Sequence, residues 1–256
     1  DVSTGEVKKE HSLTSFEVRR LAQAKYRGGI IGEGKYERPA IFPRDENKNF
    51  KIKTDLHAHL SAILSGKDLI EIGKEYNIFY PMKLAQSIGL NINNLIPDEN
   101  GNLKLNDILK CEPENGETAD AKPSNEDILT DSLEICPYTN ETFNRMEEIY
   151  TARSPFSKNK DILEPILWKI AEKYVECGVE YAELSSTEVI KDVEFLSKMH
   201  EILPKIEEFW GKKGKTINIR FLAAIARDSI EQKKDDEIDI LEEIVKSSYV
   251  VGCDFL

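Results

Sequence analysis

The stretch FKIKTDLHAHL, residues 50–60, carries the strongest structural signal in the sequence. Apolar and polar residues alternate from Phe50 to His57, and a period of two is typical of a β-strand. The segment Ser65-Gly66-Lys67-Asp68 then opens a helix that ends near Asn77. This stretch therefore predicts one strand followed by one helix.

Strands and helices alternate regularly from about residue 161 onward. Asp161 can cap a helix with one apolar face, and Gly178 ends that helix. Pro204 is expected to kink a later helix or to mark its start. The predicted strands cover residues 179–185, 216–226 and 249–256, and the helices between them cover 193–210 and 236–248. Such alternation predicts an α/β fold with parallel strands, and the nearly continuous apolar strands are typical of a sheet covered by helices.

The number of units sets the expected architecture. A complete (β/α)8 barrel takes about 250 residues, but here residues 1–50 and about 90–160 use much of the chain. The last strand reaches Leu256 without a closing element, which would leave an unpaired apolar edge. We therefore expect the N-terminal half of a TIM-like (β/α)8 barrel, about four units, over residues 51–256. Residues 1–50 would form an arm or linker, and about 90–160 a polar insertion after the first unit.

Within that insertion, residues 90–140 are rich in asparagine and acidic side chains. We expect this part to be an excursion with one or two short helices that does not contribute to the core.

The composition excludes several classes of protein. Of the 256 residues 40% are hydrophobic, which is enough to build a core and argues against a disordered chain. The net charge of −12 argues against nucleic acid and anionic membranes as partners. No run approaches the roughly 18 apolar residues of a membrane span. The four cysteines include no C-x-x-C pair, and the N-terminus has no signal-peptide pattern, so we expect a soluble, cytoplasmic protein.

The pair His57 and His59 is the strongest chemical signal. Residues two apart on a strand point the same way, so both imidazoles would face one space at the carboxyl end of the first strand. Barrel enzymes place their active sites at this end. Two neutral imidazoles are good ligands for zinc or a similar divalent ion. The alternative is a coincidental pair with one ring bonded to the backbone.

A working zinc centre needs at least a third protein ligand. The remaining histidines and two of the cysteines are poor candidates by their expected positions: His11, His200, Cys177 and Cys253. Cys177 is expected on the inner face of a helix. Asp254 lies near the end of the last strand and could reach the site, although the sequence does not fix its direction. We therefore expect the missing ligands beyond Leu256.

Four segments in the expected order together resemble the adenosine/AMP deaminase family of metal-dependent hydrolases. They are Lys53–Leu60 with the helix starting about Lys67, Gly178–Leu184, Ile219–Arg227 and Val250–Leu256. The resemblance covers about 110 residues, and only its His-x-His element is chemically specific.

The resemblance implies the zinc-dependent hydrolytic deamination of a purine nucleoside or nucleotide, with His57 and His59 as two zinc ligands. In that family a further histidine ligand, a glutamate proton donor, another histidine and an aspartate come from later strands. None of these is assigned here, so we expect no catalytic residue within this chain and no activity from it alone. The expected partners are a small purine substrate and the remaining half of the barrel, and the arm and insertion are candidate elements of a homo-oligomer.

Ser61-Ala62 stands where many nucleoside deaminases carry Asp-Gly, so the usual ribose contact is in doubt. Ser61 is a candidate substrate-binding residue through a sugar hydroxyl, and a turn serine before a helix is the alternative. Two other polar residues, Glu183 and Arg220, lie in neighbouring predicted strands and are expected to form a buried ion pair.

Two further functions stay open on the sequence. One is another metal-dependent barrel hydrolase, such as a phosphoesterase with the same His-x-His strand. The other is a degenerate, non-catalytic barrel segment that acts as a scaffold through the acidic excursion and the arm.

Overall fold

The computed structural model describes residues 31–32, 35–36, 53–111, 123–134, 145–225 and 244–255. In the N-terminal part, β1 (Ile31–Gly32) and β2 (Lys35–Tyr36) form a short antiparallel pair. The rest of the expected arm and most of the predicted helix 236–248 lie outside the described residues. None of the described helices combines the length and the apolar composition that crossing a bilayer requires.

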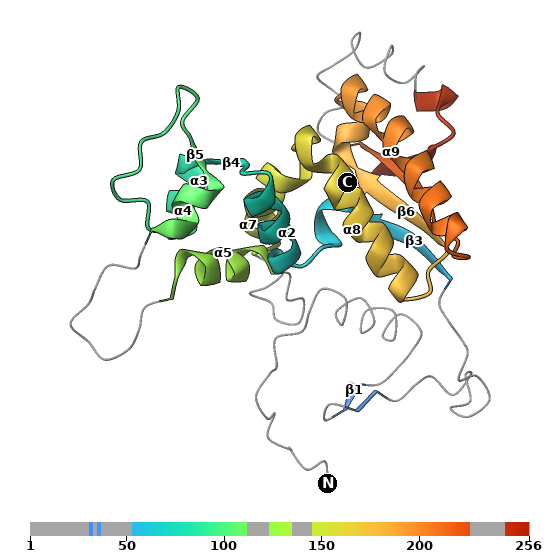
Figure 1. Cartoon of the computed structure of the whole chain (residues 1–256), viewed down its shortest axis with the longest axis horizontal. Helices are drawn as coiled ribbons and strands as arrows, with labels where there is room; N and C mark the ends of the chain where they lie inside the picture. The colour runs from blue at the N-terminus through green and yellow to red at the C-terminus, as the bar shows by residue number, and fades with distance from the viewer. Residues whose placement is uncertain are drawn as a thin grey trace.

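A four-stranded parallel sheet forms the centre of the described fold (Figure 1). Its strands are β3 (Thr54–His59), β6 (Tyr181–Ser186), β7 (Asn218–Ile225) and β8 (Val250–Phe255). They pair in the order β3-β6-β7-β8, which is also their order along the chain. Barrels use such an order without reversal, whereas doubly wound sheets reverse it. The predicted α/β class and parallel pairing are thus confirmed.

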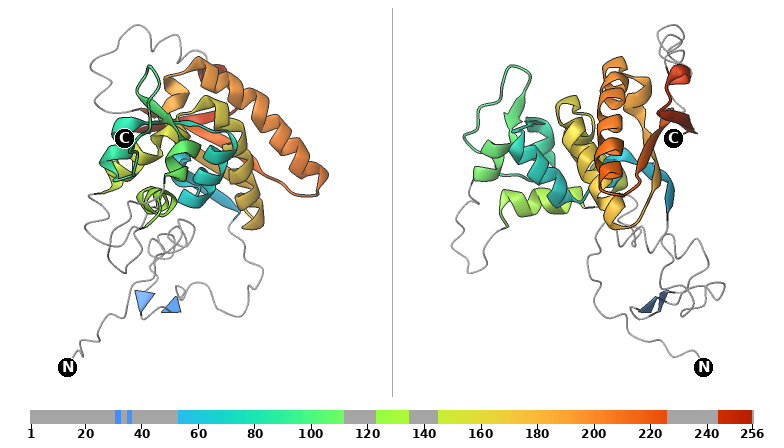
Figure 2. Two further views of the ribbon diagram at one scale, coloured as in Figure 1. Left: turned by 60° about the vertical axis from the view of Figure 1, so that its left-hand side comes forward. Right: turned by 45° about the vertical axis from the view of Figure 1, so that its right-hand side comes forward.

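Helices α8 (Leu163–Glu176) and α9 (Val193–Lys212) lie on one face of this sheet (Figures 1 and 2). Burial alternates along the first four residues of β6 and the first six of β7, as expected for strands whose two faces have different surroundings. Ala182 and Leu184 are fully buried, whereas Glu183 between them is partly exposed. The helices therefore cover one face, and polar residues of the other face keep contact with solvent.

The ends of the helices follow local sequence signals. In α2 (Gly66–Glu75) the Ser65 hydroxyl accepts from the backbone N–H of Asp68, and Asp68 accepts from Ser65 in return. Gly178 has a φ of +76°, in the left-handed region that favours glycine after a helix. The expected cap at Asp161 is wrong, because Asn159 caps a short 3-10 helix, η2 (Lys160–Ile162), ahead of α8. Helix α9 continues through Pro204.

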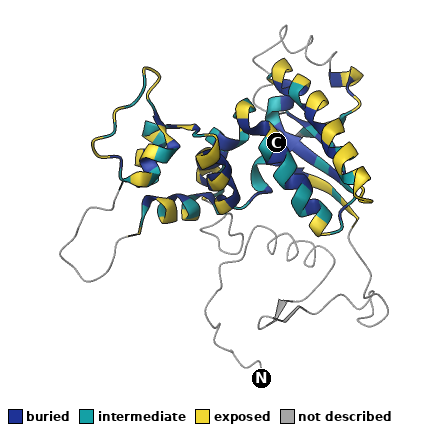
Figure 3. Cartoon of the chain, viewed as in Figure 1, coloured by how far each residue is buried: buried dark blue, intermediate teal, exposed yellow. Residues whose placement is uncertain are grey.

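The segment after the first unit is folded and contributes to the core, which corrects the expected excursion. It contains β4 (Phe79–Pro81), α3 (Met82–Ser87), β5 (Asn102–Lys104), α4 (Leu105–Lys110), α5 (Asn125–Leu133) and α7 (Met146–Ser157). Strands β4 and β5 pair antiparallel. Leu105, Ile108, Leu129 and Leu133 are fully buried in the same cluster as the sheet residues (Figure 3). Such short helices each bury only a narrow apolar stripe, so the composition of the segment stays polar.

A buried arginine joins this segment to the strand that carries the two histidines. Arg153, on α7, has no exposed surface. Its Nε donates to the Ser61 carbonyl at 2.5 Å, and its two other guanidinium nitrogens donate to the carbonyls of Leu133 and Leu64. These acceptors lie just after β3 and at the end of α5. Because a buried charge must be hydrogen-bonded, this guanidinium fixes the three segments together.

We expect Arg153→Ala to lower the free energy of unfolding by about 3 kcal/mol, because it leaves buried carbonyls without donors. Urea denaturation monitored by circular dichroism measures this change. Arg145→Ala is the matched control, since Arg145 begins the same helix and is exposed. Equal stability of the two variants would contradict the role of Arg153.

Candidate metal centre

His57 and His59 lie at the carboxyl end of β3 and share one side of it. Their ring centroids are 5.6 Å apart, and the rings are tilted by 45°. Ala58 between them is 3% exposed, which is consistent with its opposite, helix-facing direction. The pairing of β3 with β6 shifts register between Asp55 and Ala58. Such irregularities redirect side chains, and this one lies at the first histidine.

Asp254, from β8, completes a group of three potential metal ligands. Its Oδ2 lies 3.0 Å from His57 Nε2, and one ligand atom from each of His57, His59 and Asp254 lies within 4.8 Å of the others. The sequence left the direction of Asp254 open and placed the missing ligands beyond Leu256. The fold thus brings a third candidate ligand into the site from within the chain.

Ser185, on β6, orients the Asp254 carboxylate by donating its hydroxyl to Oδ2 at 2.6 Å. Partial burial acts to raise the pKa of Asp254, but the Ser185 hydrogen bond and then the charge and contact of His57 outweigh burial. The pKa therefore lies below its ordinary value, and the group is a carboxylate at neutral pH.

The chemistry of these three groups fits a divalent cation. Two imidazoles and one carboxylate match the nitrogen and oxygen ligands that zinc takes, and three protein ligands leave a coordination position for water or substrate. The His57 side chain is 53% exposed and that of Asp254 13%. One side of the group is therefore open to solvent.

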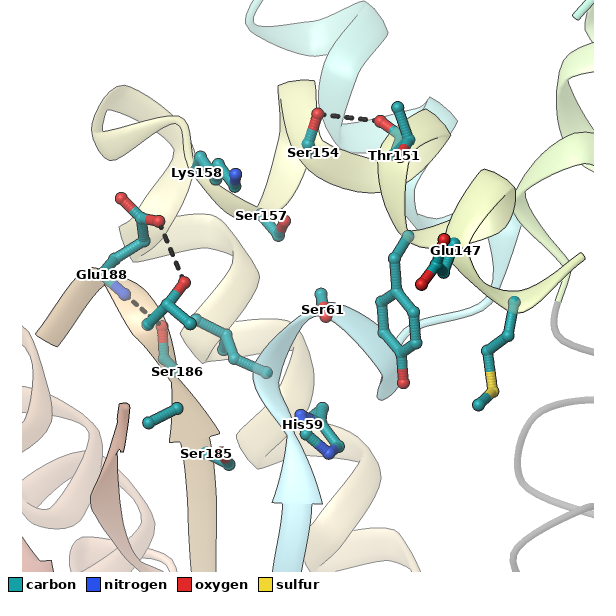
Figure 4. Close-up of a pocket in the computed structure, with 15 residues that line it drawn as sticks. His59, Ser61, Glu147, Thr151, Ser154, Ser157, Lys158, Ser185, Ser186 and Glu188 are labelled. Atoms are coloured by element: carbon teal, nitrogen blue, oxygen red, sulfur yellow. Dashed lines mark hydrogen bonds between the residues drawn. The ribbon is translucent and has the colours of Figure 1, made fainter. Parts of the chain in front are cut away.

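A cavity of about 690 Å³ opens beside His59 (Figure 4). Hydroxyl-bearing side chains from the turn after β3, from α7 and from the end of β6 line much of it: Ser61, Tyr150, Thr151, Ser154, Ser157, Ser185, Ser186 and Thr187. The rings of Tyr150 and His59 have centroids 6.0 Å apart and meet edge to face. The cavity thus gives His59 access to a space of the size of a small-molecule site, with hydroxyl groups in its wall.

Ser61, the predicted substrate-binding residue, lines this cavity. Its backbone carbonyl accepts a hydrogen bond from Arg153 Nε, which fixes the position of the Ser61 backbone. The sequence did not indicate that residues of α7 line the cavity, because they belong to no motif and α7 lies in the expected insertion. Only the packing of α7 against the turn after β3 brings Tyr150 to His59.

The other candidate residues lie elsewhere. His200 Nε2 lies 2.7 Å from the Ser247 hydroxyl, outside the candidate centre. Cys177 is exposed at the end of α8, so its expected place on an inner helix face is wrong. Cys253 is also exposed. His11 lies outside the described residues.

The expected ion pair between Glu183 and Arg220 is wrong, although the two residues are register partners. Arg220 pairs instead with Glu207 of α9 at 2.7 Å, and Glu183 accepts from the Tyr181 hydroxyl at 2.8 Å. Side chains this long reach past their nearest neighbour, so strand register alone does not fix the pair.

No family model and no curated protein matches the chain. Among solved structures, it is similar to the N6-methyl-AMP deaminase from Arabidopsis thaliana, at 13% identity and a TM-score of 0.43 over 80% of this chain and 49% of that one. It is also similar to a cog1816 amidohydrolase from Burkholderia ambifaria with bound zinc, at 12% identity and a TM-score of 0.40 over 80% and 43% of the two chains. The chain therefore spans about half the length of these proteins.

We expect the double variant His57→Ala/His59→Ala to lose bound zinc, because it removes two of three candidate ligands. The chain is loaded with zinc, dialysed, and measured by elemental mass spectrometry. His200→Ala is the control, since this histidine lies outside the group. Unchanged zinc stoichiometry in the double variant would contradict the assignment of a metal centre to these residues.

Proposed function

We propose that this chain provides the first half of a metal-dependent (β/α)8 hydrolase that deaminates a purine nucleoside or nucleotide. The observation that carries the proposal is the meeting of His57, His59 and Asp254 beside a hydroxyl-lined cavity. These groups come from the carboxyl ends of the first and last parallel strands, where barrel enzymes react.

The open form of the sheet supports the half-barrel part of the proposal. Within the described part of the chain, β3 and β8 each pair on one side only. The face that carries the histidines is partly exposed, and Leu56 on β3 is 57% exposed. A second half of the barrel would pair both edges and enclose the site, which removes the edge-strand hazard.

Each residue of the site has a distinct role in this proposal. His57, His59 and Asp254 would hold the divalent ion, and Ser185 keeps the Asp254 carboxylate oriented and ionised. A bound zinc ion supplies a nucleophilic water near neutral pH. The cavity beside His59 seats the substrate so that the carbon bearing the amino group faces this centre, and ammonia leaves as water adds. The proton donor is not assigned to any residue of this chain.

Ser61 would bind the sugar of the substrate. Its position on the cavity wall supports this role, and Arg153 holds its backbone there. A serine hydroxyl donates to or accepts from a sugar hydroxyl without a charge, which suits recognition of ribose.

The complete protein is expected to release ammonia from adenosine, AMP or ATP, and His57→Ala is expected to abolish that release. The 256-residue chain alone is expected to show no release above its own His57→Ala control, because no residue of the chain is assigned as the proton donor and the sheet of its described residues does not enclose the site. A coupled glutamate dehydrogenase assay measures ammonia in both. Release by the isolated chain would contradict the half-barrel proposal, and hydrolysis of phosphate esters without ammonia release would contradict the deaminase.

In the complete protein, Ser61→Ala is expected to raise KM about fivefold with little change in kcat, because a neutral hydrogen bond contributes about 1 kcal/mol to binding. Steady-state kinetics with the best substrate measure both constants. Ser87→Ala is the control, since Ser87 is exposed on α3 and does not line the cavity. An unchanged KM would contradict a role of Ser61 in substrate binding and leave it as a turn residue before the helix.

A further inference from the structure

A second hollow lies on the outside of the helical layer. A groove of about 600 Å³ runs between α2, α8 and α9, and none of the residues that line it lines the cavity beside His59. Figures 1 and 2 show α8 and α9 along the face of the sheet and α2 beside α8. The groove is therefore a separate surface from the candidate metal centre.

Acidic side chains outnumber basic ones in the lining of the groove. Five carboxylates and two lysines line it, and three of the carboxylates have lysine partners: Asp68, Glu164 and Glu172. Glu71 and Glu75 have no ion-pair partner among the described residues, and both are exposed. They lie four residues apart on α2, on one side of the helix, where like charges repel. An added cation between them would remove that repulsion.

Aromatic rings also line the groove. The rings of Trp168 and Phe209 have centroids 5.1 Å apart, and those of Phe209 and Trp210 lie 5.3 Å apart. Phe209 is 40% exposed and Tyr76, at the end of α2, is 48% exposed. Exposed rings gathered in one hollow on a soluble surface are typical of binding sites.

These rings already bind a cation of the chain itself. Lys213 Nζ lies 4.0 Å from the Phe209 ring centroid and 5.2 Å from that of Trp210. The aromatic faces are thus presented in the direction from which a positive charge is attracted. Lys213 is exposed and in no ion pair within the described ranges, so an incoming cation could displace it.

We propose that this groove is a docking surface for an arginine-bearing, basic segment of a partner protein. A guanidinium is planar, stacks on aromatic rings and forms bidentate hydrogen bonds with carboxylates. One arginine would therefore contact both the Phe209 ring and the carboxylates of Glu71 and Glu75. The negative charge of the groove and of the whole chain repels polyanions such as nucleic acids. The occupant is therefore a basic protein segment.

Intrinsic fluorescence tests this directly, because the two tryptophans of the chain, Trp168 and Trp210, both line the groove. The whole chain is titrated with a short, end-blocked Arg-Ser repeat peptide, and with the corresponding Glu-Ser peptide as the negative probe. A saturable fluorescence change is expected with the arginine peptide alone. The variant Glu71→Gln/Glu75→Gln is expected to weaken binding about tenfold, and Phe209→Ala about threefold.

Lys213→Ala separates docking from general charge attraction. It is expected to strengthen binding about threefold, because it frees the rings and removes a competing cation. Lys212→Ala makes the same charge change one residue earlier, outside the groove, and is expected to have little effect. Circular dichroism verifies that each variant is folded.

Several outcomes would overturn the proposal. The first is the absence of a saturable fluorescence signal. The second is an equal gain in affinity from Lys212→Ala and Lys213→Ala. The third is a loss of affinity in Glu176→Gln/Glu201→Gln equal to that in Glu71→Gln/Glu75→Gln, because the exposed carboxylates of Glu176 and Glu201 lie outside the groove. Binding of a single-stranded RNA oligonucleotide that depends on Phe209 would also overturn it, because it would assign the groove to a different class of partner.

Discussion

The hydrogen-bonded contact between Ser185, Asp254 and His57 ties three strands of the parallel sheet together at their carboxyl ends. Parallel strands all end at one edge, so residues from β3, β6 and β8 meet there although nearly two hundred positions separate the first from the last. The candidate metal centre depends on this constraint. If the strand order or direction were different, the carboxylate would lie away from the imidazoles.

The segment between the first and second strands supports the same site from the side. Arg153 bonds to carbonyls just after β3 and at the end of α5, and Tyr150 on the same helix lies against His59. The cost of burying a guanidinium is offset only while all three carbonyls stay in place. This segment therefore does two things: it completes the core and it forms a wall of the cavity. The outer groove lies among α2, α8 and α9, whose apolar residues join the core while their acidic and aromatic side chains line the groove.

The sequence predicted the elements whose signals are local and long. Four predicted strands are confirmed as one parallel sheet: the strand at the histidine pair and those near residues 181, 219 and 251. The helix that begins after Ser65 is also confirmed, and all these elements lie within a few residues of their expected bounds. Short helices such as α4 and α5 were missed as parts of the core, because their few apolar residues do not form a long periodic pattern. Their burial is decided by neighbours distant in the sequence.

The sequence by itself determined that His57 and His59 face one side of a strand, because the alternation of side chains is a property of the extended backbone. It also determined the order of strands and helices. The tertiary structure decided which way Asp254 points, that α7 lies against the histidines, and that Arg220 pairs with Glu207 rather than Glu183. Those outcomes depend on distances between segments far apart in the chain. Such distances are fixed only when the sheet has formed and the helices have packed on it.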